Sequence, residues 1–261
     1  MSQIRNPNAS YRCILSYLHV KQPVYMKTIF HPAAQRGFAN HGWLQAAHSF
    51  SFAQYYDPTK VHFGQLRVLN DDIVAPAMGF GTHGHDNMEI VTIPLRGYLA
   101  HKDSLGSVGT ITPGEVQIMS AGSGIQHSEF NASETEEVNL LQIWVFPKER
   151  NITPRYDQKA FDTSLAQNRF QLVVSPSEKE GSLWINQDAC FSLGSFDAHT
   201  EASYTFNFTQ NGAYVFVIEG EINLAGQVLG RRDAMGVYDT QTLSFTVEEA
   251  AKVLVIEIPM H

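Results

Sequence analysis

Short runs of Val, Ile, Phe and Tyr, separated by turn-forming residues, make up most of the chain. Such residues are preferred on a pleated, half-buried surface. The runs are Gly64–Leu69, Glu89–Leu95, Gly97–His101, Glu115–Ser120, Asn139–Phe146, Gln171–Val174, Tyr214–Glu219, Glu221–Leu224 and Lys252–Ile258. Between them stand the predicted turns Asn70-Asp71-Asp72, Arg96-Gly97, Leu105-Gly106, Pro113-Gly114, Asn211-Gly212, Glu219-Gly220 and Ala225-Gly226. Turns about every 8 to 12 residues are typical of a β-sandwich or barrel. Helical periodicity is limited to Lys159–Asn168, so the pattern predicts an all-β protein.

The pattern repeats weakly along the chain. Glu89–Gly97 and Tyr214–Gly220 each read as a strand that ends in a glycine turn, and each is followed by a second strand, a loop and an acidic turn. Two sequential barrels of similar plan would explain this repeat, with a junction near Pro147–Pro154. We therefore expect domains at residues 26–150 and 151–261, preceded by an extension at residues 1–25. The alternative is two unrelated hairpins.

Composition narrows the function classes. The 261 residues, 43% of them apolar, are enough for a sizeable core in one large or two small domains. Asp and Glu number 26 against 18 Lys and Arg, which gives a net charge of −8. This balance, without a basic cluster, argues against a nucleic-acid surface. No apolar run approaches the roughly 20 residues that cross a bilayer.

Two cysteines, Cys13 and Cys190, are too few for a disulfide framework. The apolar run Cys13-Ile14-Leu15 is interrupted by polar residues and no small-residue cleavage site follows it, which argues against a secretory signal. We therefore expect a cytoplasmic protein.

Two histidine pairs carry the candidate chemistry. His83 and His85 are separated by one residue, as are His127 and Glu129. On a strand, residues i and i+2 face the same side about 6.6 Å apart, so each pair can converge on one ion. Three imidazoles and a carboxylate suit Fe(II), Mn(II), Co(II), Ni(II), Cu(II) or Zn(II) rather than Mg or Ca. A single His-x-His is usually solvated decoration of a strand, but two pairs among glycines favour a metal site.

Spacing alone leaves the carboxylate open. Glu89 would lie about 13 Å from His85 on an unbroken strand, too far to share the ion. Asp86 and Asn87 are turn formers, and a bend there would bring Glu89 back on the next strand.

The other histidines have weaker claims. His41 and His48, near aromatic residues, are expected to pack rather than to ligate a metal. His101 and Asp103 have ligand-like spacing, but Lys102, Ser104 and Gly106 around them predict an exposed turn. His199 stands alone and is expected to be solvent-exposed or hydrogen-bonded.

Several stretches between Ala39 and Arg155 resemble the pirin family of the cupin superfamily, with its bacterial quercetinase-like members. The stretches are Asn40-His-Gly-Trp43, His48-Ser-Phe-Ser-Phe52, Tyr56-Asp-Pro58, Gly79-Phe-Gly-Thr-His-Gly-His85, Gln117-Ile-Met-Ser-Ala-Gly-Ser-Gly-Ile-Gln-His127 and Ile152-Thr-Pro-Arg155. The resemblance covers essentially residues 26–261. It implies a bicupin, two sequential cupin barrels with few short helices.

The resemblance also implies the site. The N-terminal barrel would hold Fe(II) through His83, His85, His127 and Glu129, with Glu89 as a neighbour of the ligands. The C-terminal barrel would lack a metal, and Tyr204–Phe208 and Leu243–Val247, where ligands would stand, contain none. Because imidazoles must be neutral to ligate, occupancy is expected to fall below about pH 5 to 6.

Three functions follow as expectations. Family members open flavonols such as quercetin with O2 to a depside and carbon monoxide, with the flavonol 3-hydroxyl proton passing to Glu129 here. Pirin relatives in animals are iron-dependent partners of transcription factors, so a regulatory, non-catalytic protein that acts through protein partners is the alternative. A zinc-dependent isomerase or hydrolase on the same fold is a third.

Overall fold

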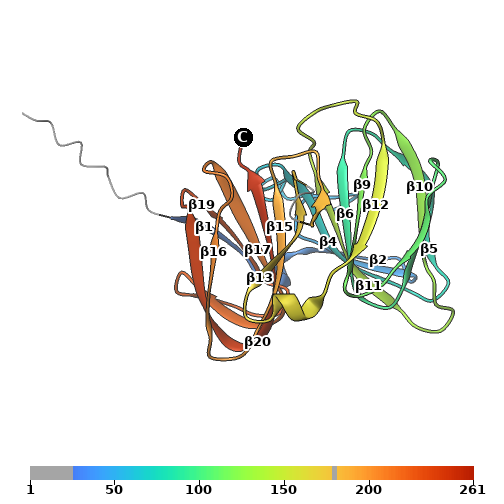
Figure 1. The fold of residues 1–261 in the computed structure, drawn as a ribbon. Helices are drawn as coiled ribbons and strands as arrows, with labels where there is room; N and C mark the ends of the chain where they lie inside the picture. The colour runs from blue at the N-terminus through green and yellow to red at the C-terminus, as the bar shows by residue number, and fades with distance from the viewer. Residues whose placement is uncertain (1–25, 178–180) are drawn as a thin grey trace, which may run out of the picture.

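Two β-barrels stand side by side in the computed structural model, which describes residues 26–177 and 181–261 (Figure 1). The predicted extension at residues 1–25, with Cys13, lies outside the described residues. The described helices are the single 3-10 turns η1 (Ala33–Gln35) and η2 (Thr163–Ala166). No helix in the described part of the chain has the length and apolar character needed to cross a membrane. The all-β bicupin prediction is confirmed.

The N-terminal barrel is made of two facing sheets. The larger has the order β12-β9-β6-β11-β4-β3-β2, and the smaller has the order β5-β10-β7-β8. The strands are β2 (Gly37–Asn40), β3 (Leu44–His48), β4 (Leu66–Val74), β5 (Gly79–His85), β6 (Glu89–Arg96), β7 (Leu99–Asp103), β8 (Val108–Ile111), β9 (Glu115–Ser120), β10 (Ile125–Asn131), β11 (Val138–Val145) and β12 (Arg155–Ala160).

The C-terminal barrel is built from one nine-stranded sheet with the order β1-β19-β17-β20-β15-β13-β14, in which β16 pairs with β20 and β18 with β17. Its strands are β1 (Lys27–His31), β13 (Phe170–Ser175), β14 (Leu183–Trp184), β15 (Cys190–Phe196), β16 (Glu201–Thr205), β17 (Asn211–Leu224), β18 (Gln227–Leu229), β19 (Ala234–Tyr238) and β20 (Thr242–Pro259).

Two strands cross between the barrels. β1, at the start of the described chain, pairs with β19 of the C-terminal sheet, and β12 pairs with β9 of the N-terminal sheet. Figure 1 shows the blue β1 among the red strands and the yellow β12 beside the green ones. The division between residues 150 and 151 stays a prediction. β1, before this division, completes the C-terminal barrel, and β12, after it, completes the N-terminal barrel.

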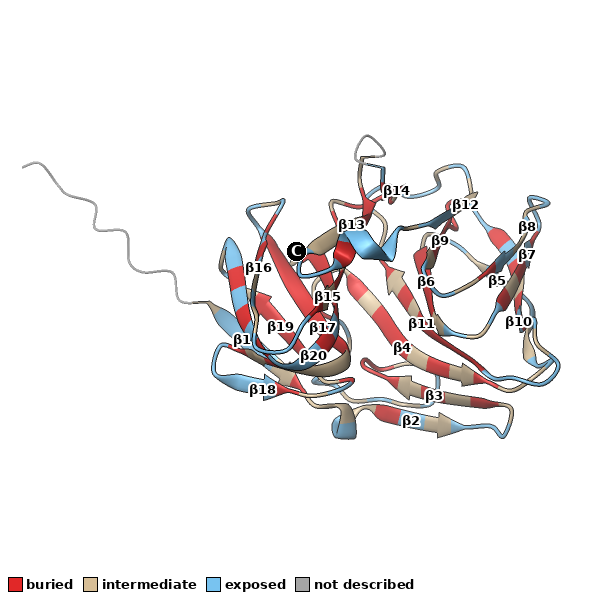
Figure 2. Cartoon of the chain, turned by 60° about the horizontal axis from the view of Figure 1, so that its bottom comes forward, coloured by how far each residue is buried: buried red, intermediate tan, exposed pale blue. Residues whose placement is uncertain are grey.

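Strand alternation assigns each face of the central strands to a different core. On β17, Tyr214 and Phe216 face the layer between the barrels, whereas Val215 and Val217 face the interior of the C-terminal barrel. On β11, Leu141 and the alternate residues after it also face the layer between the barrels. Both faces of β17 are buried from Asn211 to Ile218, whereas Gln142 and Trp144 on the other face of β11 are half-buried (Figure 2). Continuous apolar runs in the sequence are the result.

Four local predictions are wrong. Asn70-Asp71-Asp72 lies within β4, and both Asn211-Gly212 and Glu219-Gly220 lie within β17, so none of these three is a turn. The helical candidate Lys159–Asn168 is the end of β12 followed by the single turn η2. Lys159 and Ala160 pair with β9, and the Asp162 side chain caps η2 by accepting from the backbone N–H of Ser164, contacts that sequence periodicity does not report.

Candidate metal centre

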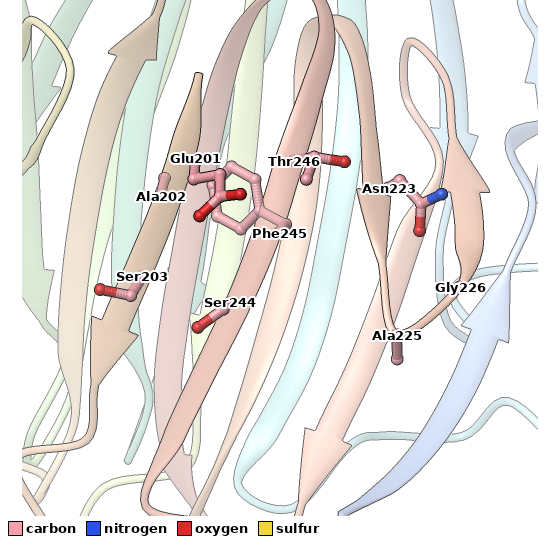
Figure 3. Close-up of a pocket in the computed structure, with 9 residues that line it drawn as sticks. All are labelled: Glu201, Ala202, Ser203, Asn223, Ala225, Gly226, Ser244, Phe245 and Thr246. Atoms are coloured by element: carbon pink, nitrogen blue, oxygen red, sulfur yellow. The ribbon is translucent and has the colours of Figure 1, made fainter. Parts of the chain in front are cut away.

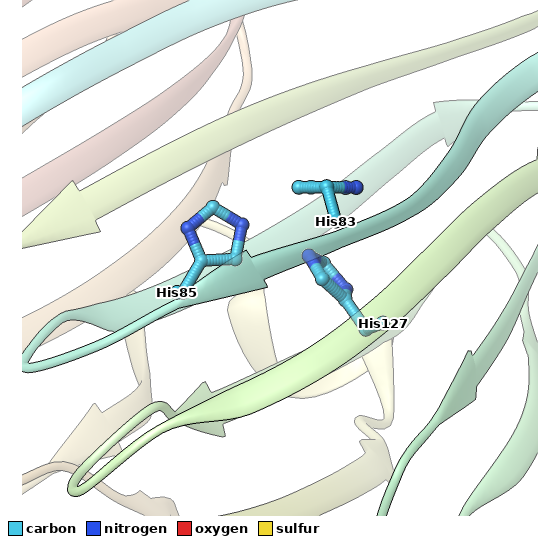
Figure 4. Close-up of side chains that lie close together, drawn as sticks. All are labelled: His83, His85 and His127. Carbon is cyan, nitrogen blue, oxygen red and sulfur yellow. The ribbon is translucent and has the colours of Figure 1, made fainter.

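The smaller sheet of the N-terminal barrel brings three histidines together. β5 and β10 are antiparallel neighbours, and their register sets His127 opposite His83 and Ile125 opposite His85. One nitrogen from each of His83, His85 and His127 lies within 4.8 Å of the other two (Figure 4). Atoms bound to one ion at about 2.1 Å lie at most about 4.2 Å apart, so the cluster is close to the spacing that a single ion needs.

The free nitrogens of this cluster fit a transition metal. His83 Nδ1 donates to the Gly81 carbonyl at 2.8 Å, which leaves the lone pair of Nε2 available. His85 Nε2 and both ring nitrogens of His127 are buried without a hydrogen-bond partner. Buried polar atoms nearly always have partners, so this group of orphaned nitrogens points to a missing ligand.

Electrostatics keep two of these imidazoles neutral. Burial, reinforced by the neighbouring His83, lowers the pKa of His85 to about 4. Burial, with His83 and His85 nearby, lowers the pKa of His127 to about 3. Neutral imidazole is the form that ligates a metal.

Glu129 lies in an adjoining cluster rather than in the first one. A β-bulge relative to β5 falls between His127 and Glu129, and a carboxylate oxygen of Glu129 groups with nitrogens of His127 and His101, again within 4.8 Å. The amides of Gln142 and Gln117 donate to its two oxygens at 2.8 and 3.4 Å. Burial raises the pKa of the Glu129 carboxyl. His127 thus belongs to both clusters and links Glu129 to the other imidazoles.

Glu89 faces away from this site. The bend expected at Asn87 is present, with a φ of 46°. Along β6, however, Thr92 points to Gln117 and Gln142 in the barrel interior, whereas Val91 belongs to the layer between the barrels. Alternation puts Glu89 on the Val91 side. There its carboxylate accepts hydrogen bonds from Ser120 Oγ (2.7 Å) and from the backbone N–H of Asn186 (3.1 Å) in the C-terminal barrel. The expectation that Glu89 neighbours the ligands is wrong.

The expectation of an exposed turn at His101 and Asp103 is also wrong. Both lie on β7 and are buried, with exposures of 1% and 7%. His101 Nε2 bonds to Asp103 Oδ2 at 3.2 Å, and Tyr156 stacks on the imidazole at a centroid distance of 4.4 Å. The polar residues next to this pair in the sequence favoured the prediction of an exposed turn. Its spacing of two residues on a strand was the one indication of a buried pair.

The remaining histidines of the described residues take no part in either cluster. His48 is buried and bonds to Asn70 at 2.9 Å, as expected for a packed residue. The same expectation for His41 is wrong, because that residue is exposed. His199 is exposed, with a φ of 62°. Among the described residues, both candidate metal clusters lie in the N-terminal barrel. The interior of the C-terminal barrel is filled by apolar side chains such as Val215, Phe245 and Val255.

A surface hollow of about 700 Å³ on the C-terminal barrel offers no comparable chemistry. It lies over β16, β20 and the β17–β18 turn, and Glu201, Ser203, Asn223, Ser244 and Thr246 are among its lining residues (Figure 3). None of its lining residues carries a buried polar atom without a partner.

Both halves of the chain match known protein families. Residues 30–145 match the family model described as Pirin, and residues 172–258 match that of the quercetinase C-terminal cupin domain. A protein named quercetin 2,3-dioxygenase from Escherichia coli K12 is 41% identical over 227 residues, which cover 87% of this chain and 96% of that protein. A pirin-like protein of Caulobacter vibrioides is 37% identical and covers 87% of this chain and 97% of its own length.

Solved structures of bacterial pirins have the same fold as this chain. The bacterial pirin YhhW from Escherichia coli in complex with nickel(II) superimposes with a TM-score of 0.84 at 39% identity, and the match covers 89% of this chain and 99% of that one. A second YhhW structure gives a TM-score of 0.85 at 40% identity. The predicted resemblance is confirmed: the chain belongs to the pirin family of the cupin superfamily.

Proposed function

We propose that this protein is a metal-dependent dioxygenase that opens the flavonol ring, converting quercetin and O2 into a depside and carbon monoxide. The observation that carries the proposal is the cluster of His83, His85 and His127, whose free nitrogens face one another on β5 and β10. The name quercetin 2,3-dioxygenase of a relative at 41% identity supports the choice of reaction.

In this proposal His83, His85, His127 and Glu129 hold one divalent metal, with Fe(II) as the expected ion. The nickel complex of YhhW supports a divalent metal in this family. When bound, such an ion supplies Lewis-acid stabilisation of the flavonol 3-oxyanion.

Glu129 is proposed to accept the proton of the 3-hydroxyl group. Its carboxylate is buried two residues beyond His127 on β10, and the Gln142 and Gln117 amides hold both oxygens in place. A positioned carboxylate of this kind is a standard general base.

Aromatic side chains at the site support an aromatic substrate. Trp144 packs edge-on against His85 at a centroid distance of 4.9 Å, and Phe52 packs edge-on against Trp144 at 5.3 Å. Aromatic pairs prefer this geometry, and a flavonol ring can extend the same arrangement.

Oxygen uptake by protein loaded with Fe(II) under anaerobic conditions tests the proposal. With quercetin, we expect one carbon monoxide released for each O2 consumed, and no uptake after the metal is removed by a chelator. Fully loaded protein that consumes no O2 with a panel of flavonols would contradict the enzyme proposal and favour an iron-dependent regulatory role.

A further inference from the structure

The strand next to the proposed metal ligands carries a second buried pair that the proposed reaction does not use. β7 pairs with β10 so that Glu129 lies opposite His101 and His127 lies opposite Asp103. The side chains of His101 and Asp103 are both fully buried. The pair therefore stands directly beside the carboxylate and one imidazole of the proposed site.

The orientation of His101 is held from several sides. Asp103 Oδ2 accepts a hydrogen bond from His101 Nε2 at 3.2 Å. The other oxygen, Asp103 Oδ1, accepts hydrogen bonds from the backbone N–H groups of Leu105 (2.9 Å) and Ser107 (3.0 Å). Tyr156, on β12, stacks on the ring with an interplanar angle of 21°. A ring fixed in this way loses little further freedom when it binds a neighbour.

The other nitrogen of His101, Nδ1, is buried and has no hydrogen-bond partner. A nitrogen of His101 lies within 4.8 Å of a Glu129 oxygen and of a His127 nitrogen. His101 does not group with His83 and His85, and the two residues it groups with, His127 and Glu129, already belong to the proposed metal site. This arrangement suits a residue that orients a ligand rather than one that builds a second centre.

We infer that His101, held by Asp103, is a positioning residue that fixes the carboxylate of Glu129 for metal binding. The inference rests on the proposed metal site. Residues that adjoin metal ligands from outside orient them, and their loss typically lowers metal affinity by about 10- to 100-fold.

The test uses His101→Phe, which keeps a ring against Tyr156 but removes both nitrogens, and His101→Gln, which keeps a polar amide. Asp103→Asn removes the charge that holds the ring. Exposed His41→Phe is the matched control. Ni(II) affinity is measured by competition with a chelator, coordination by the EPR spectrum of the Cu(II)-loaded protein, and folding by the melting temperature of the metal-free form.

We expect His101→Phe and Asp103→Asn to bind one Ni(II) about 10- to 100-fold more weakly with an altered Cu(II) spectrum. We expect His101→Gln to recover part of the loss and His41→Phe to match the wild type. Unchanged affinity and spectrum in His101→Phe would overturn the inference. The inference would also be overturned if a His83→Ala/His85→Ala double variant still bound Ni(II) and that binding were lost on adding His101→Phe. His101 would then be a metal ligand.

A positioning role would likewise be overturned if weaker Ni(II) binding and altered Cu(II) spectra occurred only in variants whose metal-free form has a lowered melting temperature. Wild-type protein that binds Ni(II) with the expected variant pattern but consumes no O2 with quercetin would refute the proposed reaction and leave the positioning role standing.

Discussion

The imidazole of His127 on β10 lies 4.4 Å, centroid to centroid, from that of His83, the residue directly opposite it on β5. These residues are 44 positions apart in the sequence (127 − 83). Antiparallel pairing of two strands brings them together and also sets His85 beside both. The site thus depends on register, and a slip of one residue would turn His127 to the other face.

Replacing His127 by alanine is expected to weaken metal binding by more than about 100-fold, because loss of an outer partner alone costs about 10- to 100-fold. Metal content after dialysis against a weak chelator measures the effect. His41→Ala, at an exposed position, is the control. Bound metal that survives the His127→Ala change would show that His127 is not a ligand.

Glu129→Gln is expected to retain metal through the three imidazoles, with an affinity at least as weak as that of His101→Phe, and when fully loaded to lose turnover by roughly 10²- to 10⁴-fold, the usual contribution of a positioned general base. The three imidazoles remain, and the amide cannot accept the proton. Metal analysis and O2 uptake on the same preparation check both halves. Turnover equal to that of the wild type would refute the base role.

Buried histidines make the metal-free protein sensitive to acid. The pKa values of His85 and His127, about 4 and about 3, lie below the unfolded value near 6.5. The unfolded chain therefore binds more protons in between, and stability is lost as the pH falls through 6.5 towards those values. Denaturant unfolding of the metal-free protein at pH 7 and pH 5 is expected to show this loss, with a smaller difference in His127→Gln.

The same pKa values revise the pH at which metal should be lost. Both imidazoles are neutral in the folded protein at pH 5, so their protonation does not compete with metal until lower pH than unperturbed histidines would predict. NMR titration of the metal-free protein measures this directly. A His127 that protonates near pH 6.5 would contradict it.

Glu89 provides a test of the layer between the barrels. Burial raises the pKa of its carboxyl to about 7. The folded state then binds more protons than the unfolded state between about pH 4.5 and 7, so stability is expected to fall as pH rises through this window. Glu89→Gln, which can still accept from Ser120 and Asn186, is expected to remove the decline, with a gain at pH 8 of at most about 3 kcal/mol.

Exposed Glu137, in a surface ion pair with Arg96, is the matched position for that experiment. Glu137→Gln is expected to leave the pH dependence of unfolding unchanged, because surface pairs contribute about 0 to 1 kcal/mol. Equal pH profiles for Glu89→Gln and the wild type would contradict the buried assignment of Glu89.

The sequence allowed the fold class and the three clustered histidines of the candidate site to be predicted, because both have local periodicity. Strands such as β9 (Glu115–Ser120) match their predicted runs, and period-2 spacing identified His83, His85 and His127. The carboxylate could not be chosen from spacing. The face of β6 on which Glu89 lies depends on what packs against each side of that strand.

Errors arose where polar residues have distant partners. Asp71 on β4 binds Arg232, 161 positions away, and Asn70 binds His48, so a predicted turn is a strand. His101 and Asp103 were expected on the surface because their chain neighbours are polar, yet Tyr156 of β12 covers the imidazole. Such partners are defined only by the tertiary structure.

Anomalous diffraction at the metal edge, from crystals of protein loaded with Fe(II) or Ni(II), tests the central claim most directly. The account predicts one peak in the N-terminal barrel, about 2.1 Å from a nitrogen of each of His83, His85 and His127 and within bonding distance of a Glu129 oxygen. A fully loaded crystal with no anomalous peak among these side chains, or with the peak elsewhere in the molecule, would contradict it.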